Sequence, residues 1–210
     1  MFELSKLTQS TERFQKYVEP QLYDSGLFDP NNSYVVVCEG DDDDLKSKLD
    51  RYAGIDMCTI DTNKQVVQGI ASRVQTGPCY RTFTIRAITD NDSLSTEFKK
   101  RAEAIKNGDM YPTWTIQAYI SENPDNDSQL ICTVGVVRTV ELFNYLMAQF
   151  DGENIVSWGD FYNMLQTRYS IKEVEIKTAF TGGAVFLACD WDKLIASGVH
   201  VDILQGIFDK

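Results

Sequence analysis

The segment between residues 54 and 138 alternates β-type runs with one helical stretch, and this order limits the folds that the chain can adopt. Two strand-like runs, 54–61 and 65–75, are separated only by Thr62-Asn63-Lys64, a spacing that predicts an antiparallel hairpin. The other elements expected here are a strand at 80–87, a helix at 98–106, and strands at 114–121 and 130–138. The last of these strands is almost continuously apolar, so we expect it inside a sheet.

Further elements are expected on both sides of this segment. Residues 1–19 form an amphipathic helical pattern that ends at Pro20 or shortly after it, and 34–38 is a β-branched run. The remaining expected elements are helices at 45–52, 140–150, 160–167 and 190–195, strands at 171–180 and 184–189, and a tail after residue 195.

No internal repeat or low-complexity linker interrupts the 210 residues. We therefore expect one domain over 1–210, with a core at about 34–150 and a C-terminal helix and hairpin extension at about 151–210. The expected fold class is α/β (α+β), with a central mixed sheet flanked by helices.

Composition and charge narrow the classes of protein to which the chain can belong. Hydrophobic residues make up 43% of the sequence, too many for a disordered chain, and no apolar run is long enough to cross a membrane. The first six residues lack the basic start and apolar block of a signal peptide, so we expect a cytoplasmic protein with no membrane contact. The net charge of −11 argues against unspecific coating of DNA but permits a local basic groove.

The five cysteines are scattered and form no close pair, which argues against a structural zinc site. Four of them lie in apolar, strand-like stretches, where we expect buried free thiols. These four are Cys38, Cys58, Cys132 and Cys189.

The most informative motif lies around the predicted hairpin. Asp50 and Asp56 flank Gly54-Ile55 where the first strand begins, and the second strand ends in Ala71-Ser72-Arg73-Val74-Gln75. Arg73 and Gln75 are two residues apart, so their side chains share one face of the strand. Together with the order of elements, this motif resembles the PD-(D/E)XK, or restriction-endonuclease-like, superfamily, whose core runs helix, three antiparallel strands, helix and strand. The resemblance covers about half of the chain and implies a protein associated with nucleic acid.

In that superfamily a strand-borne Asp and an acid on the next strand hold Mg²⁺, and a nearby Lys orients the attacking water. The resemblance places Asp56 at the metal-binding position, Arg73 and Gln75 with it at catalytic positions, and Asp50 and Glu39 as further metal ligands. The acid-x-Lys motif of the superfamily would align with Ala71-Ser72-Arg73 or with Arg73-Val74-Gln75. Neither alignment provides the second carboxylate. We therefore expect an incomplete or relocated metal site: a non-catalytic accessory protein or, if active, a Mg²⁺-dependent nuclease. The alternative is that Asp50 and Asp56 bind backbone N–H groups in turns.

A second match to the superfamily motif lies downstream, where Glu173-Val174-Glu175-Ile176-Lys177 contains Glu-x-Lys and Asp160 precedes it. Glu175 and Lys177 would then mark the site. However, Asp160 is expected to open a helix instead of lying on a strand, and charge pairing on a half-exposed sheet produces the same pattern.

Basic residues gather after the predicted hairpin, in the strand expected at 80–87 and the helix expected at 98–106. With Arg73, they form a candidate phosphate-binding face if strand and helix pack as in the resembled fold; otherwise they belong to a solvated surface. The candidate nucleic-acid-binding residues are Arg81, Arg86, Lys99, Lys100 and Arg101. Aromatic residues interleave with them, for which we expect core packing, with base stacking as the alternative. These are Tyr80, Phe83, Tyr111 and Trp114.

The run Asp41-Asp42-Asp43-Asp44 supports a second functional hypothesis. It lacks the ligand spacing of an EF-hand, which argues against a calcium loop. With the net charge of −11, it suggests an acidic protein-interaction or inhibitor protein of viral or microbial origin, without enzymatic activity, that covers a basic surface of a protein partner.

Overall fold

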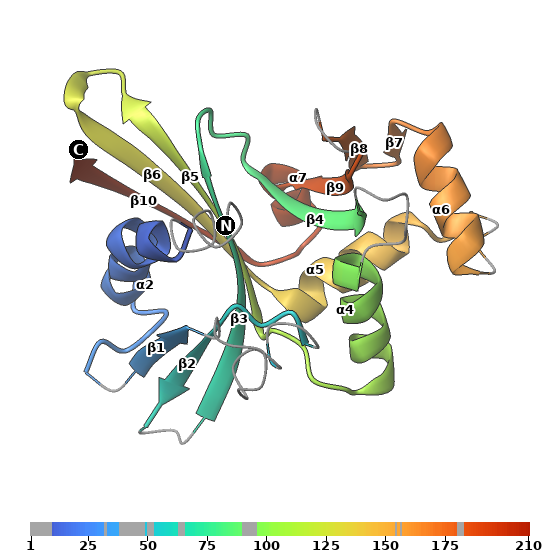
Figure 1. Ribbon diagram of the computed structural model, residues 1–210, viewed down its shortest axis with the longest axis horizontal. Helices are drawn as coiled ribbons and strands as arrows, with labels where there is room; N and C mark the ends of the chain where they lie inside the picture. The colour runs from blue at the N-terminus through green and yellow to red at the C-terminus, as the bar shows by residue number, and fades with distance from the viewer. Residues whose placement is uncertain are drawn as a thin grey trace, which may run out of the picture.

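The computed structural model describes residues 10–31, 33–37, 49, 53–62, 66–89, 96–153, 155, 157–179 and 183–210. In these ranges the chain forms a six-stranded sheet, ordered β1-β2-β3-β5-β6-β10, and a four-stranded sheet, ordered β4-β9-β8-β7. Helices pack against both sheets (Figure 1). The expected α+β class, with a mixed sheet flanked by helices, is thus confirmed.

The first sheet is built around the predicted hairpin. β2 (Met57–Asp61) pairs with β3 (Val66–Thr76) in antiparallel register, with Met57 opposite Ile70. β1 (Ser33–Val37) extends this pair at one edge. On the other side β3 runs parallel to β5 (Trp114–Asn123), after the crossover through helix α4 (Thr96–Asn107). β6 (Asn126–Arg138) pairs with β5 and lies inside the sheet, as its apolar sequence predicts.

The strand β4 (Thr82–Ile88) departs from the expected topology. The predicted core has three antiparallel strands in a row, but β4 leaves the first sheet and pairs with β9 (Val185–Asp190). The second sheet continues through β8 (Val174–Thr178) to β7 (Ser170–Ile171). One face of β4 carries Phe83, Ile85 and Ala87, which are buried in the larger apolar cluster with residues of β8 and β9. The other face carries Thr82, Thr84 and Arg86, so β4 needs apolar cover on one side only.

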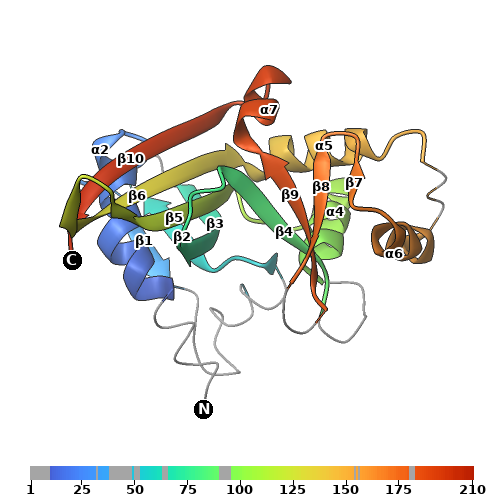
Figure 2. The same ribbon diagram turned by 90° about the horizontal axis from the view of Figure 1, so that it is seen from above.

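The C-terminal third does not form a separate extension. β7, β8 and β9 build most of the second sheet, and β10 (Val201–Asp209) pairs with β6 along nine residues of the first. The predicted tail after residue 195 is therefore wrong. Figure 2 shows β10 running beside β6. The chain from residue 151 onward is interleaved with the earlier part because its strands complete both sheets.

Helices cover the sheets in two groups. At the N-terminal end, a π-helical turn, η1 (Phe14–Val18), leads into α2 (Glu19–Asp24), which contains Pro20 in its first turn and ends shortly after it, as expected. These helices pack on the first sheet. The helices grouped around the second sheet are α4, α5 (Thr139–Gln149), α6 (Trp158–Thr167) and α7 (Trp191–Ala196).

The strand β5 is buried on both faces, and this divides the core. Ile116, Ala118 and Ile120 pack with the N-terminal helices, whereas Tyr119 belongs to a larger apolar cluster with the second sheet. The fully buried Trp191 lies between the sheets, with ring centroids 5.9 Å from Tyr119 and 5.6 Å from Phe83. The second sheet meets β5 on the face that carries Thr115 and Tyr119, whereas Ile116, Ala118 and Ile120 lie on the other face. Polar side chains on the Thr115–Tyr119 face line cavities.

Candidate functional site

Asp56 and Arg73 line one cavity of about 350 Å³ between the two sheets and helix α4. The motif around Gly54 explains how Asp56 reaches it. Gly54 has φ +64°, a left-handed conformation that favours glycine, and a Cβ atom there would lie 3.4 Å from Nε of Arg101. The turn delivers Asp56 to the edge of β3, where its N–H donates to the Ile70 carbonyl at 2.9 Å.

The Asp56 carboxylate has a structural task. Its Oδ2 accepts a hydrogen bond of 2.6 Å from the N–H of Ser72, on the edge of β3 that β2 no longer covers. Asp56 thus occupies the position of a further strand residue and satisfies a backbone donor, as the alternative interpretation of this residue expects. Asp56 both lines the cavity and fixes the edge of β3.

Glu97 organises the cationic side of the cavity, a role that sequence reasoning missed. Its Oε2 accepts from Arg73 at 3.2 Å and from the N–H of Arg86 at 3.0 Å, and its Oε1 accepts from Arg101 at 3.3 Å. Glu97 lies in the first turn of α4, where a carboxylate is favoured by the helix dipole and can reach Arg101 four residues on. Glu97 therefore holds two guanidinium groups at the cavity wall.

Two buried donors line the cavity without a partner among the residues that the structure describes. The side chain of Gln117 is 2% exposed; its Oε1 accepts from Thr84 at 3.0 Å, while its Nε2 donates to none of them. Arg101 is 6% exposed, and its Nε is likewise unpaired within this set. Unsatisfied buried donors are costly, so an acceptor that reached these two atoms would be stabilised.

The charge of this cavity opposes that of the whole chain. Its described lining contains four cationic side chains and two carboxylates, within a protein of net charge −11. The cations are Arg73, Arg86, Lys100 and Arg101, and the carboxylates are Asp56 and Glu97. We call this site the basic cavity. An oxyanion such as a phosphate would neutralise the excess positive charge and accept from the unpaired donors.

The basic cavity is a poor magnesium site in its described part. Asp56 is bonded to backbone, Glu97 is bonded to two arginines, and the surrounding guanidinium groups repel a second cation. Within the described ranges, no three His, Cys, Asp or Glu side chains gather in a way that could hold a metal ion. Glu39 and Asp50, the other carboxylates predicted for the metal, lie outside the residues that the structure describes.

The predicted nucleic-acid-binding residues divide into two groups. Arg86, Lys100 and Arg101 line the basic cavity. Arg81 instead pairs with Asp192 at 2.7 Å, an interaction that raises the pKa of its guanidinium, and Lys99 lies 5.7 Å from the centroid of the Trp158 ring. Neither is among the described residues that line the cavity, so α4 presents Lys99 and Lys100 to different surroundings.

Gln75 lies in an adjoining cavity of about 380 Å³, together with Arg73 and Thr84, which line both cavities. We call this second site the aromatic cavity because the rings of Tyr80, Tyr119 and Phe186 line it. The Tyr119 hydroxyl donates to the Thr82 carbonyl at 2.8 Å, and burial raises the pKa of Tyr119 above its usual value.

The downstream motif has local structural roles. Asp160 forms a capping box with Ser157 at the start of α6, accepting from the Ser157 N–H at 2.9 Å. Lys177 pairs with Glu175 at 3.1 Å along the same strand, β8, with both side chains exposed. The Asp41–Asp44 run of the second functional hypothesis lies outside the described residues, so that hypothesis stays a prediction.

Comparisons of the chain with protein-family models, with curated proteins and with solved structures found no match. The restriction-endonuclease-like resemblance therefore stays a prediction. Among the described helices, none is long and apolar enough to cross a lipid bilayer. Of the four predicted buried thiols, Cys58, Cys132 and Cys189 are buried, whereas Cys38 lies outside the described residues.

Proposed function

We propose that the chain is a nucleic-acid-associated protein that binds a backbone phosphate in the basic cavity and does not cleave it. The observation that carries this proposal is the convergence of four cationic side chains and two unpaired buried donors in one cavity of an acidic protein. A bound phosphate would accept from the Gln117 amide and the Arg101 guanidinium while pairing with Lys100.

The order of elements supports a restriction-endonuclease-like origin for this site. The β2–β3 hairpin, the crossover helix α4 and the parallel strand β5 follow the order of that superfamily, with Asp56 and Arg73 at its site positions. The placement of β4 in the second sheet departs from it. Where those nucleases need a second carboxylate, this chain has Ala71 or Arg73, depending on the alignment, so we propose that it retains phosphate binding without metal chemistry.

Two neighbouring lysines on α4 provide the test. Binding of a fluorescein-labelled oligothymidylate would be measured by fluorescence anisotropy at increasing salt concentrations, with Lys100→Gln compared against Lys99→Gln. We expect Lys100→Gln to weaken binding roughly tenfold, as the loss of one charge-assisted hydrogen bond of about 1.5 kcal/mol predicts. The slope of log affinity against log salt should become shallower by about 0.7. Lys99→Gln removes the same charge outside the cavity and should bind like the wild type.

Equal weakening by both substitutions would contradict the proposal, because general electrostatic attraction would then explain binding. Absence of binding by the wild type would also contradict it. Incubation of the oligonucleotide with protein and Mg²⁺ or Mn²⁺ tests the non-catalytic part, for which we expect intact product. Cleavage that is lost in Asp56→Asn, which retains a carbonyl acceptor for the Ser72 N–H, would instead identify an active nuclease.

A further inference from the structure

We infer that the aromatic cavity is a nucleobase subsite and that the ligand of this protein is single-stranded nucleic acid, with one phosphate in the basic cavity and the adjoining base against Tyr80. This inference rests on the proposed function. Its basis is the juxtaposition of the two cavities, which share Arg73 and Thr84 as their common wall.

The two cavities are linked through Phe186. The guanidinium of Arg73 lies 5.1 Å from the centroid of the Phe186 ring, and that of Arg86 lies 5.5 Å from it. Cations at these distances interact favourably with the ring face. Phe186 thus holds, from the aromatic side, two of the cations that line the basic cavity. A ligand whose phosphate pairs with Arg73 in the basic cavity would therefore lie next to the ring of Phe186 in the aromatic cavity.

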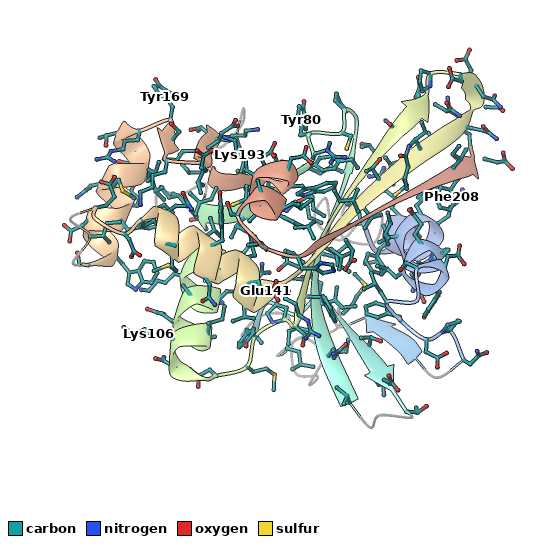
Figure 3. All side chains as sticks on the ribbon, turned by 180° about the vertical axis from the view of Figure 1, so that it is seen from behind. Tyr80, Lys106, Glu141, Tyr169, Lys193 and Phe208 are labelled. Atoms are coloured by element: carbon teal, nitrogen blue, oxygen red, sulfur yellow. The ribbon has the colours of Figure 1, made fainter. Side chains whose placement is uncertain are left out.

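Tyr80 supplies the exposed ring that a base requires. Its side chain is 60% exposed and lies on the connection between β3 and β4 (Figure 3). The buried Tyr119 supports it edge-on at a centroid distance of 6.1 Å, and Nζ of Lys177 lies 5.6 Å from its ring centroid. Lys177 also pairs with Glu175 on the same strand. A large exposed aromatic ring held from below and flanked by a cation is the arrangement on which unpaired bases stack.

The arrangement favours a single strand over a duplex. In a duplex the faces of each base are covered by its neighbours, so a base can stack on Tyr80 only when it is unpaired and turned out of the helix. Gln75 lines the same cavity and carries an amide, which can both donate to and accept from the polar edge of a base. A pyrimidine or purine with its attached phosphate therefore matches both cavities, whereas free phosphate would use the first alone.

The test compares two ligands of equal charge, an oligothymidylate and an abasic oligomer of the same length, by anisotropy. We expect Tyr80→Ala to weaken oligothymidylate binding about 5-fold to 100-fold, the range for one stacked base, and to leave abasic binding unchanged. Tyr80→Phe should bind like the wild type, and Tyr80→Leu, which keeps apolar bulk, should be weak like Tyr80→Ala. The matched control is Tyr169→Ala, since Tyr169 is 91% exposed and lies beside α6, well apart from Tyr80 (Figure 3).

The outcomes separate this inference from the proposed function. If Tyr80→Ala binds oligothymidylate like the wild type while Lys100→Gln is weakened, the base subsite is wrong and phosphate binding stands. Equal weakening of both ligands by Tyr80→Ala also overturns the subsite, because the ring would then support the backbone site. If the wild type binds neither ligand, both proposals fall.

Discussion

Gly135 lies in β6 against Trp191, and its replacement by Ala is expected to destabilise the junction between the two sheets. A Cβ atom on Gly135 would lie 2.4 Å from Cζ2 and 2.5 Å from Cε2 of the indole ring. Non-bonded carbon atoms pack at about 3.5–4.0 Å, so ring or strand must move by about 1 Å. The strand is paired with β5 on one side and β10 on the other, and the ring is fully buried against Phe83 and Tyr119.

The expected cost follows from these two constraints. Overpacking a rigid core site costs about 1–3 kcal/mol. Replacing Gly by Ala restores less than about 1 kcal/mol by restricting the unfolded chain. We therefore expect Gly135→Ala to lower the free energy of unfolding by about 2 kcal/mol, measured by urea denaturation followed by circular dichroism.

A double-mutant cycle isolates the contact. Trp191→Phe removes the part of the indole that the new methyl group would meet, so adding Gly135→Ala to Trp191→Phe should cost less than about 0.5 kcal/mol. The coupling energy should then be about 2 kcal/mol. If Gly135→Ala costs the same in both backgrounds, the loss comes from the backbone of β6 and the reasoning is refuted. A Gly135→Ala variant as stable as the wild type would refute it equally.

Three further predictions concern single side chains. Burial raises the pKa of the Cys132 thiol from 9.0 to about 12, so the stability that depends on the neutral thiol is complete below about pH 9 and is lost as the pH rises toward 12. At about pH 10 the wild type should have lost about 1.4 kcal/mol from this group, and Cys132→Ala should decline less steeply in urea denaturation; an equal decline would contradict this. Cys79 is exposed, so Cys79→Ser should lose about one equivalent of the thiol that reacts rapidly with Ellman's reagent, and an unchanged fast phase would be inconsistent with its placement. Ser157→Ala should cost about 1 kcal/mol in thermal denaturation, and Asp160→Ala should cost less in that background than alone; additive costs would mean that the two do not act as one capping box.

Elements formed by neighbouring residues could be predicted from the sequence, whereas pairings between distant strands could not. The short spacing of the two strand-like runs predicts the β2–β3 hairpin locally, and the apolar run of β6 indicates an interior strand. The strand at β4 was also predictable, but its pairing with β9 was not, because nothing local identifies that partner. β10 was missed for the same reason, although its residues from Val201 onward carry a strand-like mixture of apolar and polar side chains.

The candidate site shows the same division. The resemblance led us to expect Asp56 and Arg73 at one site, and both line the same cavity. Glu97 was missed as a site residue, since its contacts with Arg73 and Arg86 join different elements. Gln117 was missed as well, because its contact with Thr84 of β4 joins two different strands. A strand apolar at even positions and rich in Thr, Gln and Tyr at odd ones is the signal that could have indicated a second, cavity-lining face.

The late strands of both sheets have a consequence for how the chain reaches this structure. Phe83 of β4 pairs with Cys189 of β9, about 100 positions further along, and β6 pairs with β10, about 60 to 80 positions further along. Closing such long loops costs entropy before any contact repays it, so we expect slow refolding. During that interval the apolar edge of β4 is available to other chains. The surface most exposed to misassembly would thus be the strand that later forms the wall of both cavities.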